Sequence, residues 1–316
     1  MNTVGLLAYG NTAPHALKGL MKNFSVPWIV IPPQTDDGAP FPVEQLAQEY
    51  KIPIHKTNSN KEIHELVLKT SPDAVVISSY NKILEQELLR SSTFINIHHG
   101  DLPRFRGRAN SNWAIILGRK QIGLTFHEAI PDLDAGRIYA HYMVPIEKKD
   151  TVKTMYDKFN KIIEDDLGMI VNKVLDGYKG EEQKGEGTYC CTRLPQDGYI
   201  DWHQTSEQIY NFIRALTKPF PGSFTYFEGK KMIIWESEIP EIQKKFEGRI
   251  PGRITGISKD GVEVLTADGI IRIKNVSYEG REQNASEIIK TVKKSLGLNI
   301  VELYEMYKHI LKINEH

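Results

Sequence analysis

Short β-rich segments alternate with helix-period segments through the first half of this chain, and this alternation most restricts its fold. The predicted strands cover residues 3–10, 26–33, 73–79 and 94–99. Apolar residues recur every three to four positions, as in helices, over 15–24, 43–50, 61–70 and 82–91. Nearly continuous valine, isoleucine and leucine in the strands is typical of a mostly parallel sheet covered on both faces. We therefore predict an α/β, Rossmann-like first domain.

The pattern changes in the second half. Strands predicted over 122–129 and 137–146 precede a long helical stretch over 152–179. The next eight residues, GEEQKGEG, are polar and rich in glycine, which is typical of a linker. A capping box formed by Thr205 and Gln208 predicts the start of a helix. Short alternating segments follow, separated by the turn signals KDG and ADG, which predict hairpins and a small C-terminal β-barrel of the OB-like type.

The length of 316 residues exceeds what a single hydrophobic core usually supports, so we predict more than one domain. The predicted parts are an α/β domain over 1–185, a linker over 186–204, a barrel-like domain over 205–295 and a helix over 296–316. Apolar spacing in this last helix suits either packing on the barrel or a homodimer contact.

Composition narrows the class of protein. The apolar runs are strand-sized and too short to cross a bilayer, and the N-terminus lacks a secretory signal, so we expect no membrane partner. Cys190 and Cys191 are the two cysteines, which is no disulfide framework and predicts a reducing, cytoplasmic setting. Forty basic residues balance forty acidic ones, which lowers the expectation of a nucleic-acid partner without excluding a local basic patch.

Several ligand-binding motifs are absent or incomplete. The segment GLLAYGNT has the glycine spacing of a phosphate-binding loop, but Asn11 stands where the loop needs lysine. No G-x-G-x-x-G follows a predicted strand, so a dinucleotide site lacks its main signature. His98 and His99 are adjacent, and neighbouring side chains on a strand point to opposite faces. We therefore predict no metal site.

Asn96 and His98 are two residues apart at the end of a predicted strand, so their side chains share one face. In open parallel sheets, ligands bind beyond the carboxyl ends of the strands. Some thirty residues later, a turn carries Asp132 and Asp134. A carboxylate beside the histidine would fix its tautomer and raise its pKa. On spacing alone, a loop-capping histidine and ordinary turn aspartates are the favoured explanation of the pattern.

The segment from 94 to 140 resembles the core of the folate-dependent formyltransferases. Their pattern is Asn-x-His, then Leu-Pro-x-x-Arg-Gly, then Asp-x-Gly, which here is NIHHGDLPRFRG followed by DAG. The resemblance extends upstream through SPDAVVISSYNKIL and downstream through TRLPQDGYIDWH and ALTKPFPGSFTYFEGKKMIIW. Sugar N-formyltransferases of surface-polysaccharide (lipopolysaccharide or O-antigen) pathways and methionyl-tRNA formyltransferases are similar.

The resemblance implies an enzyme with 10-formyltetrahydrofolate as co-substrate, no metal, and Asn96, His98 and Asp134 as the catalytic residues. It implies a donor pocket formed by a larger set, namely Lys82, Ile83, Leu84, Arg108, Ile130, Pro131, Asp132 and Leu133. Where the family often has Ser-Leu-Leu-Pro, this chain has Gly100-Asp101-Leu102-Pro103. The role of that serine therefore cannot be carried over.

Two acceptors fit the resemblance, and the main prediction is the amine of a nucleotide-linked amino sugar. The alternative is methionyl-tRNA, whose enzymes tend to have a long basic loop after the second strand. Here that loop reads PPQTDDGAPFP, with two aspartates and no lysine or arginine, which disfavours a phosphate backbone. A non-catalytic nucleotide-binding module and a donor hydrolase are further alternatives.

Overall fold

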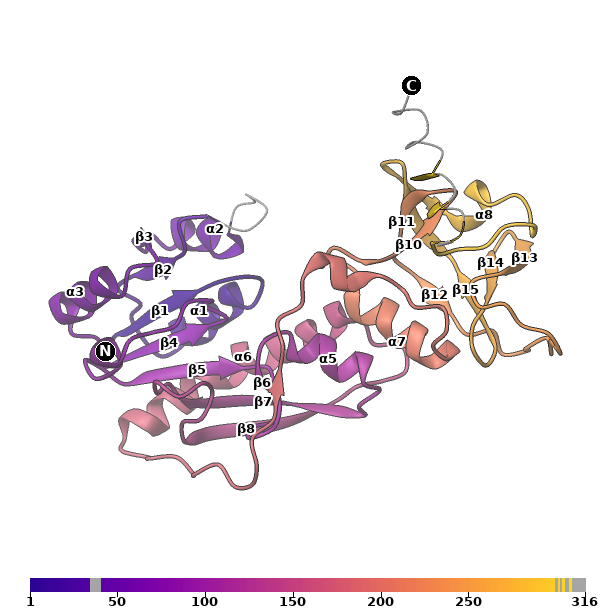
Figure 1. Ribbon diagram of the computed structural model, residues 1–316. Helices are drawn as coiled ribbons and strands as arrows, with labels where there is room; N and C mark the ends of the chain where they lie inside the picture. Colours follow the sequence, from indigo (N-terminus) through magenta and orange to yellow (C-terminus); the bar gives the residue numbers. More distant parts are fainter. Residues whose placement is uncertain (35–40, 299–300, 302, 305–306, 309–316) are drawn as a thin grey trace. The chain divides into compact units, whose positions relative to one another are not determined.

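The computed structural model describes residues 1–34, 41–298, 301, 303–304 and 307–308 (Figure 1). Backbone contacts divide the chain into two compact units. The first comprises Met1–Ser111, Lys120–Lys148 and Thr154–Thr192. The second comprises Asn112–Arg119, Lys149–Lys153 and the chain from Arg193 onward. Two short segments from the first half of the sequence therefore belong to the second unit.

The first unit is built on a seven-stranded sheet with the order β3-β2-β1-β4-β5-β7-β8. Its strands are β1 (Val4–Ala8), β2 (Ile29–Ile31), β3 (Ile54–Lys56), β4 (Ala74–Ser78), β5 (Phe94–His98), β7 (Gln121–Glu128) and β8 (Ile138–Pro145). The first five pair in parallel, whereas β7 and β8 add an antiparallel edge. The mostly parallel sheet is as predicted, and β3 is a strand that the sequence patterns missed.

Helices accompany this sheet. They are α1 (Ala13–Met21), α2 (Pro42–Glu49), α3 (Asn60–Thr70), α4 (Gln86–Leu89) and the long α6 (Val152–Leu175). Ile63 and Val67 of α3 share a buried cluster with Leu7, Val75 and Ile77 of the sheet. On α1, Gly19 lies so close to the backbone of Ile163 on α6 that an added Cβ would be 2.7 Å from its carbonyl oxygen. The segment predicted as a helix over 82–91 forms only the short α4.

The second unit contains two four-stranded antiparallel sheets with the orders β10-β11-β16-β17 and β12-β15-β14-β13. The strands are β10 (Ser223–Phe227), β11 (Lys230–Ile234), β12 (Ser237–Glu238), β13 (Ile254–Ser258), β14 (Gly261–Leu265), β15 (Ile270–Ile273), β16 (Asn275–Tyr278) and β17 (Arg281–Asn284). Hairpins occur at both predicted turn signals. The barrel-like second fold is thus confirmed.

Two helices of the second unit begin at residues whose side chains cap them. α7 (Ser206–Leu216) starts at the predicted capping box, in which Thr205 Oγ1 accepts from the backbone N–H of Gln208 at 3.2 Å. The short α8 (Ala285–Ile288) follows β17. α5 (Asn110–Ile116) begins in the first unit and continues into the second. Among the described residues, no helix is long and apolar enough to cross a membrane.

The glycine-rich segment after α6 is held by hydrogen bonds, unlike the linker that its composition predicts. Glu181 exchanges two backbone hydrogen bonds with Ile138, at 2.8 and 2.9 Å. Farther on, β9 (Tyr189–Cys190) pairs in parallel with β6 (Arg106–Gly107). The predicted helix over 296–316 and the aspartate-containing loop over 32–42 lie largely outside the described residues.

Candidate active site

The end of β5 separates two histidines that are adjacent in sequence. His98 lies on the same face as Asn96, whereas His99 packs on the other face against Tyr156 and Phe159 of α6, with ring centroids 5.1 Å apart in both cases. The alternation of side chains along a strand produces this division. As predicted, the two rings do not converge, and only His98 can share chemistry with Asn96.

A third polar residue on this face comes from the neighbouring strand. His127 on β7 is the antiparallel partner of Asn96, so their side chains lie side by side. Asn96 Nδ2 donates to His127 Nε2 over 3.0 Å. The other ring nitrogen of His127, Nδ1, donates to the backbone carbonyl of Glu128 over 2.7 Å. These two bonds hold the ring in place and put the proton of neutral His127 on Nδ1, whereas a protonated ring can also donate from Nε2 to Asp134 Oδ1, 3.5 Å away.

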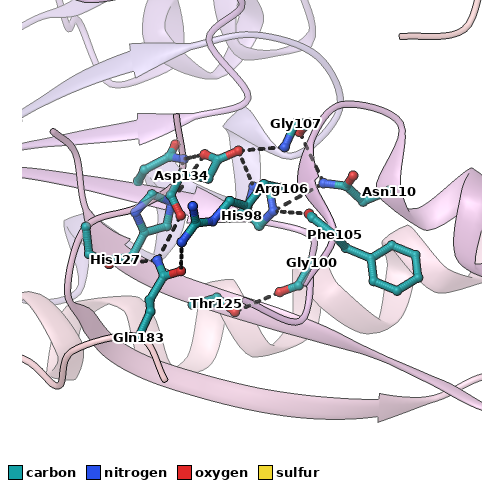
Figure 2. A network of polar contacts seen from close by, with 12 residues as sticks. His98, Gly100, Phe105, Arg106, Gly107, Asn110, Thr125, His127, Asp134 and Gln183 are labelled. Carbon is teal, nitrogen blue, oxygen red and sulfur yellow. Dashed lines mark hydrogen bonds and ion pairs between the residues drawn. The ribbon is translucent and has the colours of Figure 1, made fainter. Parts of the chain in front are cut away.

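Asp134 reaches these residues from the turn between β7 and β8 (Figure 2). Its Oδ2 lies 3.6 Å from His98 Nδ1, and its Oδ1 lies 3.5 Å from His127 Nε2. Asn96 Nδ2 also donates to Asp134 Oδ1 over 3.4 Å. The structure therefore brings together Asn96, His98 and Asp134, and adds His127 to them.

The turn that carries Asp134 is held from several sides. The backbone N–H of Gly107 donates to Asp134 Oδ2 over 2.8 Å. Gln183 Nε2 donates to the carbonyls of Asp134 and Gly136, at 2.8 and 2.9 Å, while its Oε1 accepts from Arg106 Nη2 at 2.6 Å. The apparent linker thus contributes a side chain that holds the turn carrying Asp134.

Burial and charge set the protonation states of the site. Burial acts to raise the pKa of Asp134, but its hydrogen bond with His127, the charge of His98 and the Gly107 N–H together lower it to about 2. Burial lowers the pKa of His98 below the usual value for histidine, although the Asp134 carboxylate acts to raise it. Asp134 thus raises the pKa of His98 as predicted, but the net shift is downward because burial outweighs the carboxylate.

Two groups contact the remaining nitrogen of His98. His98 Nε2 lies 2.7 Å from the backbone carbonyl oxygen of Phe105 and 3.2 Å from Asn110 Nδ2. Asn110 is the first residue of α5, and both it and His98 are 5% exposed. An acceptor and a donor therefore lie at the same ring nitrogen (Figure 2).

The same residues bring three possible metal ligands together. Nitrogen atoms of His98 and His127 and an oxygen of Asp134 lie within 4.8 Å of one another. However, Asn96 directs an N–H at the Nε2 lone pair of His127 and at Asp134 Oδ1. A metal ion would have to displace this donor, so the arrangement favours proton chemistry over a resident metal.

The residues predicted to bind the folate donor come from three segments: 82–84 follow β4, Arg108 follows β6, and 130–133 follow β7. Ile83, which follows β4, is 84% exposed, and Leu133 in the turn before Asp134 is 56% exposed. Lys82, Arg108, Pro131 and Asp132 are exposed, whereas Leu84 and Ile130 are partly buried. Their role in donor binding stays a prediction.

Three residues of the site escaped the sequence-based prediction. His127 carried a usable signal, because Thr125 and His127 repeat the two-residue spacing of Asn96 and His98 on a strand. Asn110 and Gln183 had no comparable signal, since only the folded chain brings them to His98 and to the Asp134 turn.

Comparisons with known proteins identify this arrangement. Residues 34–167 match the family model described as "Formyl transferase", and residues 194–293 match "Formyl transferase, C-terminal domain". The chain is 31% identical to a methionyl-tRNA formyltransferase from Macrococcus caseolyticus over 89% of this chain and 92% of that protein. It therefore belongs to the formyltransferase family, and the predicted class of enzyme is confirmed.

One further sequence relative and one solved structure are also similar to this chain. The chain is 32% identical to the bifunctional polymyxin resistance protein ArnA of Wigglesworthia glossinidia brevipalpis, over 87% of this chain, but spans only 45% of that relative. The fold is similar to that of the solved structure of WlaRD, a sugar 3N-formyl transferase in the presence of dTDP and 5-N-formyl-THF. The TM-score is 0.59 with 18% identity over 89% of this chain and 99% of that one.

Proposed function

We propose that this protein transfers a formyl group from 10-formyltetrahydrofolate to the amine of a nucleotide-linked amino sugar. The convergence of Asn96, His98 and Asp134 at the end of the sheet carries this proposal. The folate and the nucleotide named with WlaRD support a folate donor and a nucleotide-linked acceptor.

The three side chains match the needs of formyl transfer to an amine. The amine nitrogen forms a bond to the formyl carbon, and negative charge grows on the formyl oxygen. In the proposed reaction, an N–H of the Asn96 amide donates to that oxygen in place of its 3.4 Å contact with Asp134 Oδ1, and such a donor typically contributes about 2.7–4 kcal/mol to transition-state binding. The bond from the formyl carbon to the folate nitrogen then breaks.

His98 moves the proton that this exchange requires. It accepts a proton from the attacking amine and returns it to the departing folate nitrogen, so that no net proton is gained or lost. Its lowered pKa keeps it neutral, and thus able to act as a base, near neutral pH. Asp134, which stays ionised because its pKa is about 2, orients His98 and stabilises the transient imidazolium.

The test supplies purified protein with 10-formyltetrahydrofolate and a panel of UDP- and dTDP-linked amino sugars, and follows release of tetrahydrofolate. We expect turnover with at least one nucleotide amino sugar, lowered roughly 10²–10⁴-fold in His98→Ala. Donor consumption without an acceptor would indicate a hydrolase, and donor binding without turnover would indicate a non-catalytic module. Either result would overturn the proposal.

Methionyl-tRNA is the second candidate acceptor, and the similarity to the Macrococcus caseolyticus enzyme over 92% of its length favours it. Such an enzyme must bind the phosphates of the acceptor stem, so its affinity would fall steeply with salt. Filter binding and formylation of charged initiator tRNA, side by side with the sugar panel, distinguish the two. Tight, salt-sensitive binding followed by formylation would replace the sugar assignment.

A further inference from the structure

The contacts of His98 Nε2 point to a role for Asn110, a buried residue at the start of α5. The Phe105 carbonyl, 2.7 Å away, can only accept a hydrogen bond, so it favours a protonated Nε2. The Asn110 amide nitrogen, 3.2 Å away, can only donate, so it favours an unprotonated Nε2. Nε2 therefore has a hydrogen-bond partner whether or not it carries a proton.

The orientation of the Asn110 amide is set by a second contact. Its Nδ2 also lies 3.2 Å from the carbonyl oxygen of Gly107, which can only accept. Turning the amide over would place two carbonyl oxygens against each other, so the nitrogen faces His98. The Oδ1 atom of Asn110 is buried and has no hydrogen-bond partner among the described residues. A buried amide that leaves its oxygen unpaired is unfavourable for folding, which indicates that the position serves another purpose.

Gly100 provides the space in which these contacts form. A Cβ atom at Gly100 would lie 2.4 Å from His98 Nε2 and 2.5 Å from the carbonyl oxygen of Phe105. Either distance is far shorter than a non-bonded contact allows. The carbonyl of Gly100 accepts from Thr125 Oγ1 at 2.7 Å, so the backbone is held in this place. The absence of a side chain at Gly100 is therefore required by the arrangement around Nε2.

We propose that Asn110 and Gly100 are positioning residues that let His98 gain and lose a proton at Nε2 while its ring stays in place. In neutral His98, the Nδ1–H faces Asp134 and the bare Nε2 accepts from Asn110. After His98 takes the proton of the attacking amine, the new Nε2–H donates to Phe105. The role in catalysis rests on the proposed function, whereas the hydrogen-bond exchange itself does not.

The tautomer of His98 tests the proposal without an activity assay. In neutral wild-type protein, Nδ1 carries the proton beside Asp134 and Nε2 accepts from Asn110, so ¹⁵N NMR of the full chain is expected to show a protonated Nδ1 and an unprotonated Nε2. In Asn110→Leu and Asn110→Ala, Nε2 is expected to become the protonated nitrogen. A wild-type ring that is wholly Nε2–H, and unchanged in both variants, would overturn the proposal.

Kinetics provide a second, separate readout. Asn110→Leu is expected to lower kcat by roughly tenfold to a hundredfold, part of the 10²–10⁴ that acid–base catalysis supplies, with little change in KM. Loss of the donor at Nε2 favours protonation of His98, so the acid limb of the pH–rate profile is expected to move to higher pH. Wild-type kcat and an unmoved limb would contradict the proposal.

Matched variants distinguish the positioning of His98 from a general loss of folding. Asn112→Leu removes a buried asparagine from the same helix, whose Nδ2 donates to the carbonyl of Ala215 instead, and is expected to leave the His98 shifts unchanged. Gly100→Ala is expected to lose activity and to displace the His98 resonances. In the control Gly248→Ala, the added Cβ meets nothing within 4 Å, so activity and resonances are expected to stay as in wild type. If wild-type protein formylates no acceptor but the tautomers respond as described, the proposed function fails and the hydrogen-bond exchange stands.

Discussion

Asn96 and His127 face each other across the antiparallel pair of β5 and β7, and Asn96 Nδ2 donates to His127 Nε2 over 3.0 Å. The bond orients the amide that we assign to the formyl oxygen. His127 lowers the pKa of Asp134 through a hydrogen bond and through its charge. The same charge also lowers the pKa of His98. A residue that takes no proton in the proposed reaction thus contacts Asn96 and lowers the pKa values of His98 and Asp134.

Removal of His127 is expected to change the pH dependence of catalysis. In His127→Phe, Asp134 loses a hydrogen bond that lowers its pKa, and His98 loses a neighbouring charge that lowers its own, so both pKa values rise. The acid limb of the kcat/KM profile is therefore expected to move to higher pH. His64→Phe, a histidine replacement on α3, serves as the control. An unshifted limb in His127→Phe would show that His127 is passive.

Loss of the proton carrier is expected to abolish most turnover while sparing the donor site. His98→Ala should lower kcat by roughly 10²–10⁴-fold, the usual contribution of a positioned acid–base group. Binding of 10-formyltetrahydrofolate, followed by tryptophan fluorescence, is expected to stay within a few-fold of wild type. Full activity in this variant would remove the basis of the proposed mechanism.

The buried His99 is expected to make the fold sensitive to acid. Burial, reinforced by the charge on His98, lowers the pKa of His99 from 6.5 to about 3. Between these pH values the unfolded chain binds a proton that the folded protein does not, so stability declines as pH falls below about 6.5. Each such proton changes the unfolding free energy by about 1.4 kcal/mol per pH unit.

Urea denaturation between pH 7 and pH 4 provides the measurement for His99. His99→Phe keeps an aromatic ring against Tyr156 and Phe159 and is expected to show a shallower decline than wild type. His55→Gln, which replaces an exposed histidine on β3, is expected to follow the wild-type curve. If the unfolding free energies of wild type and His99→Phe fall equally with pH, His99 is not the cause of the acid sensitivity.

Gly136 is expected to tolerate no side chain, because a Cβ there would lie 2.0 Å from the carbonyl oxygen of Glu128. Gly136→Ala must move the turn that carries Asp134, at a cost of about 1–3 kcal/mol in the free energy of unfolding. Activity is expected to fall more than stability alone explains, since Asp134 moves away from His98. Denaturation and kinetics at a temperature where the variant is folded test both effects.

Chelation is expected to leave catalysis intact. Because Asn96 occupies the lone pair of His127 that a metal would use, EDTA treatment should not change kcat. Loss of activity on EDTA treatment, with recovery on addition of Zn²⁺, would instead assign His98, His127 and Asp134 to a metal centre.

The sequence predicted those parts of the site that depend on local order. Asn96 and His98 could be placed on one face because alternation along a strand is a local property, and the Asp134 turn followed from the family resemblance. His127 could not be assigned to Asn96, because the register of β5 with β7 depends on strand order, which the sequence does not state. Gln183 was hidden in a polar, glycine-rich segment whose composition is that of a linker.

The division of the chain also affects how its halves can be exchanged. α5 begins with Asn110 beside His98, but from Asn112 onward it belongs to the second unit, where Asn112 bonds to Ala215. A chain shortened after Thr192 would keep this helix and lose the residues that anchor its far end. Recombination with the C-terminal half of another enzyme would therefore have to carry 112–119 and 149–153 along, so the catalytic half is not a module that can be grafted by a single cut.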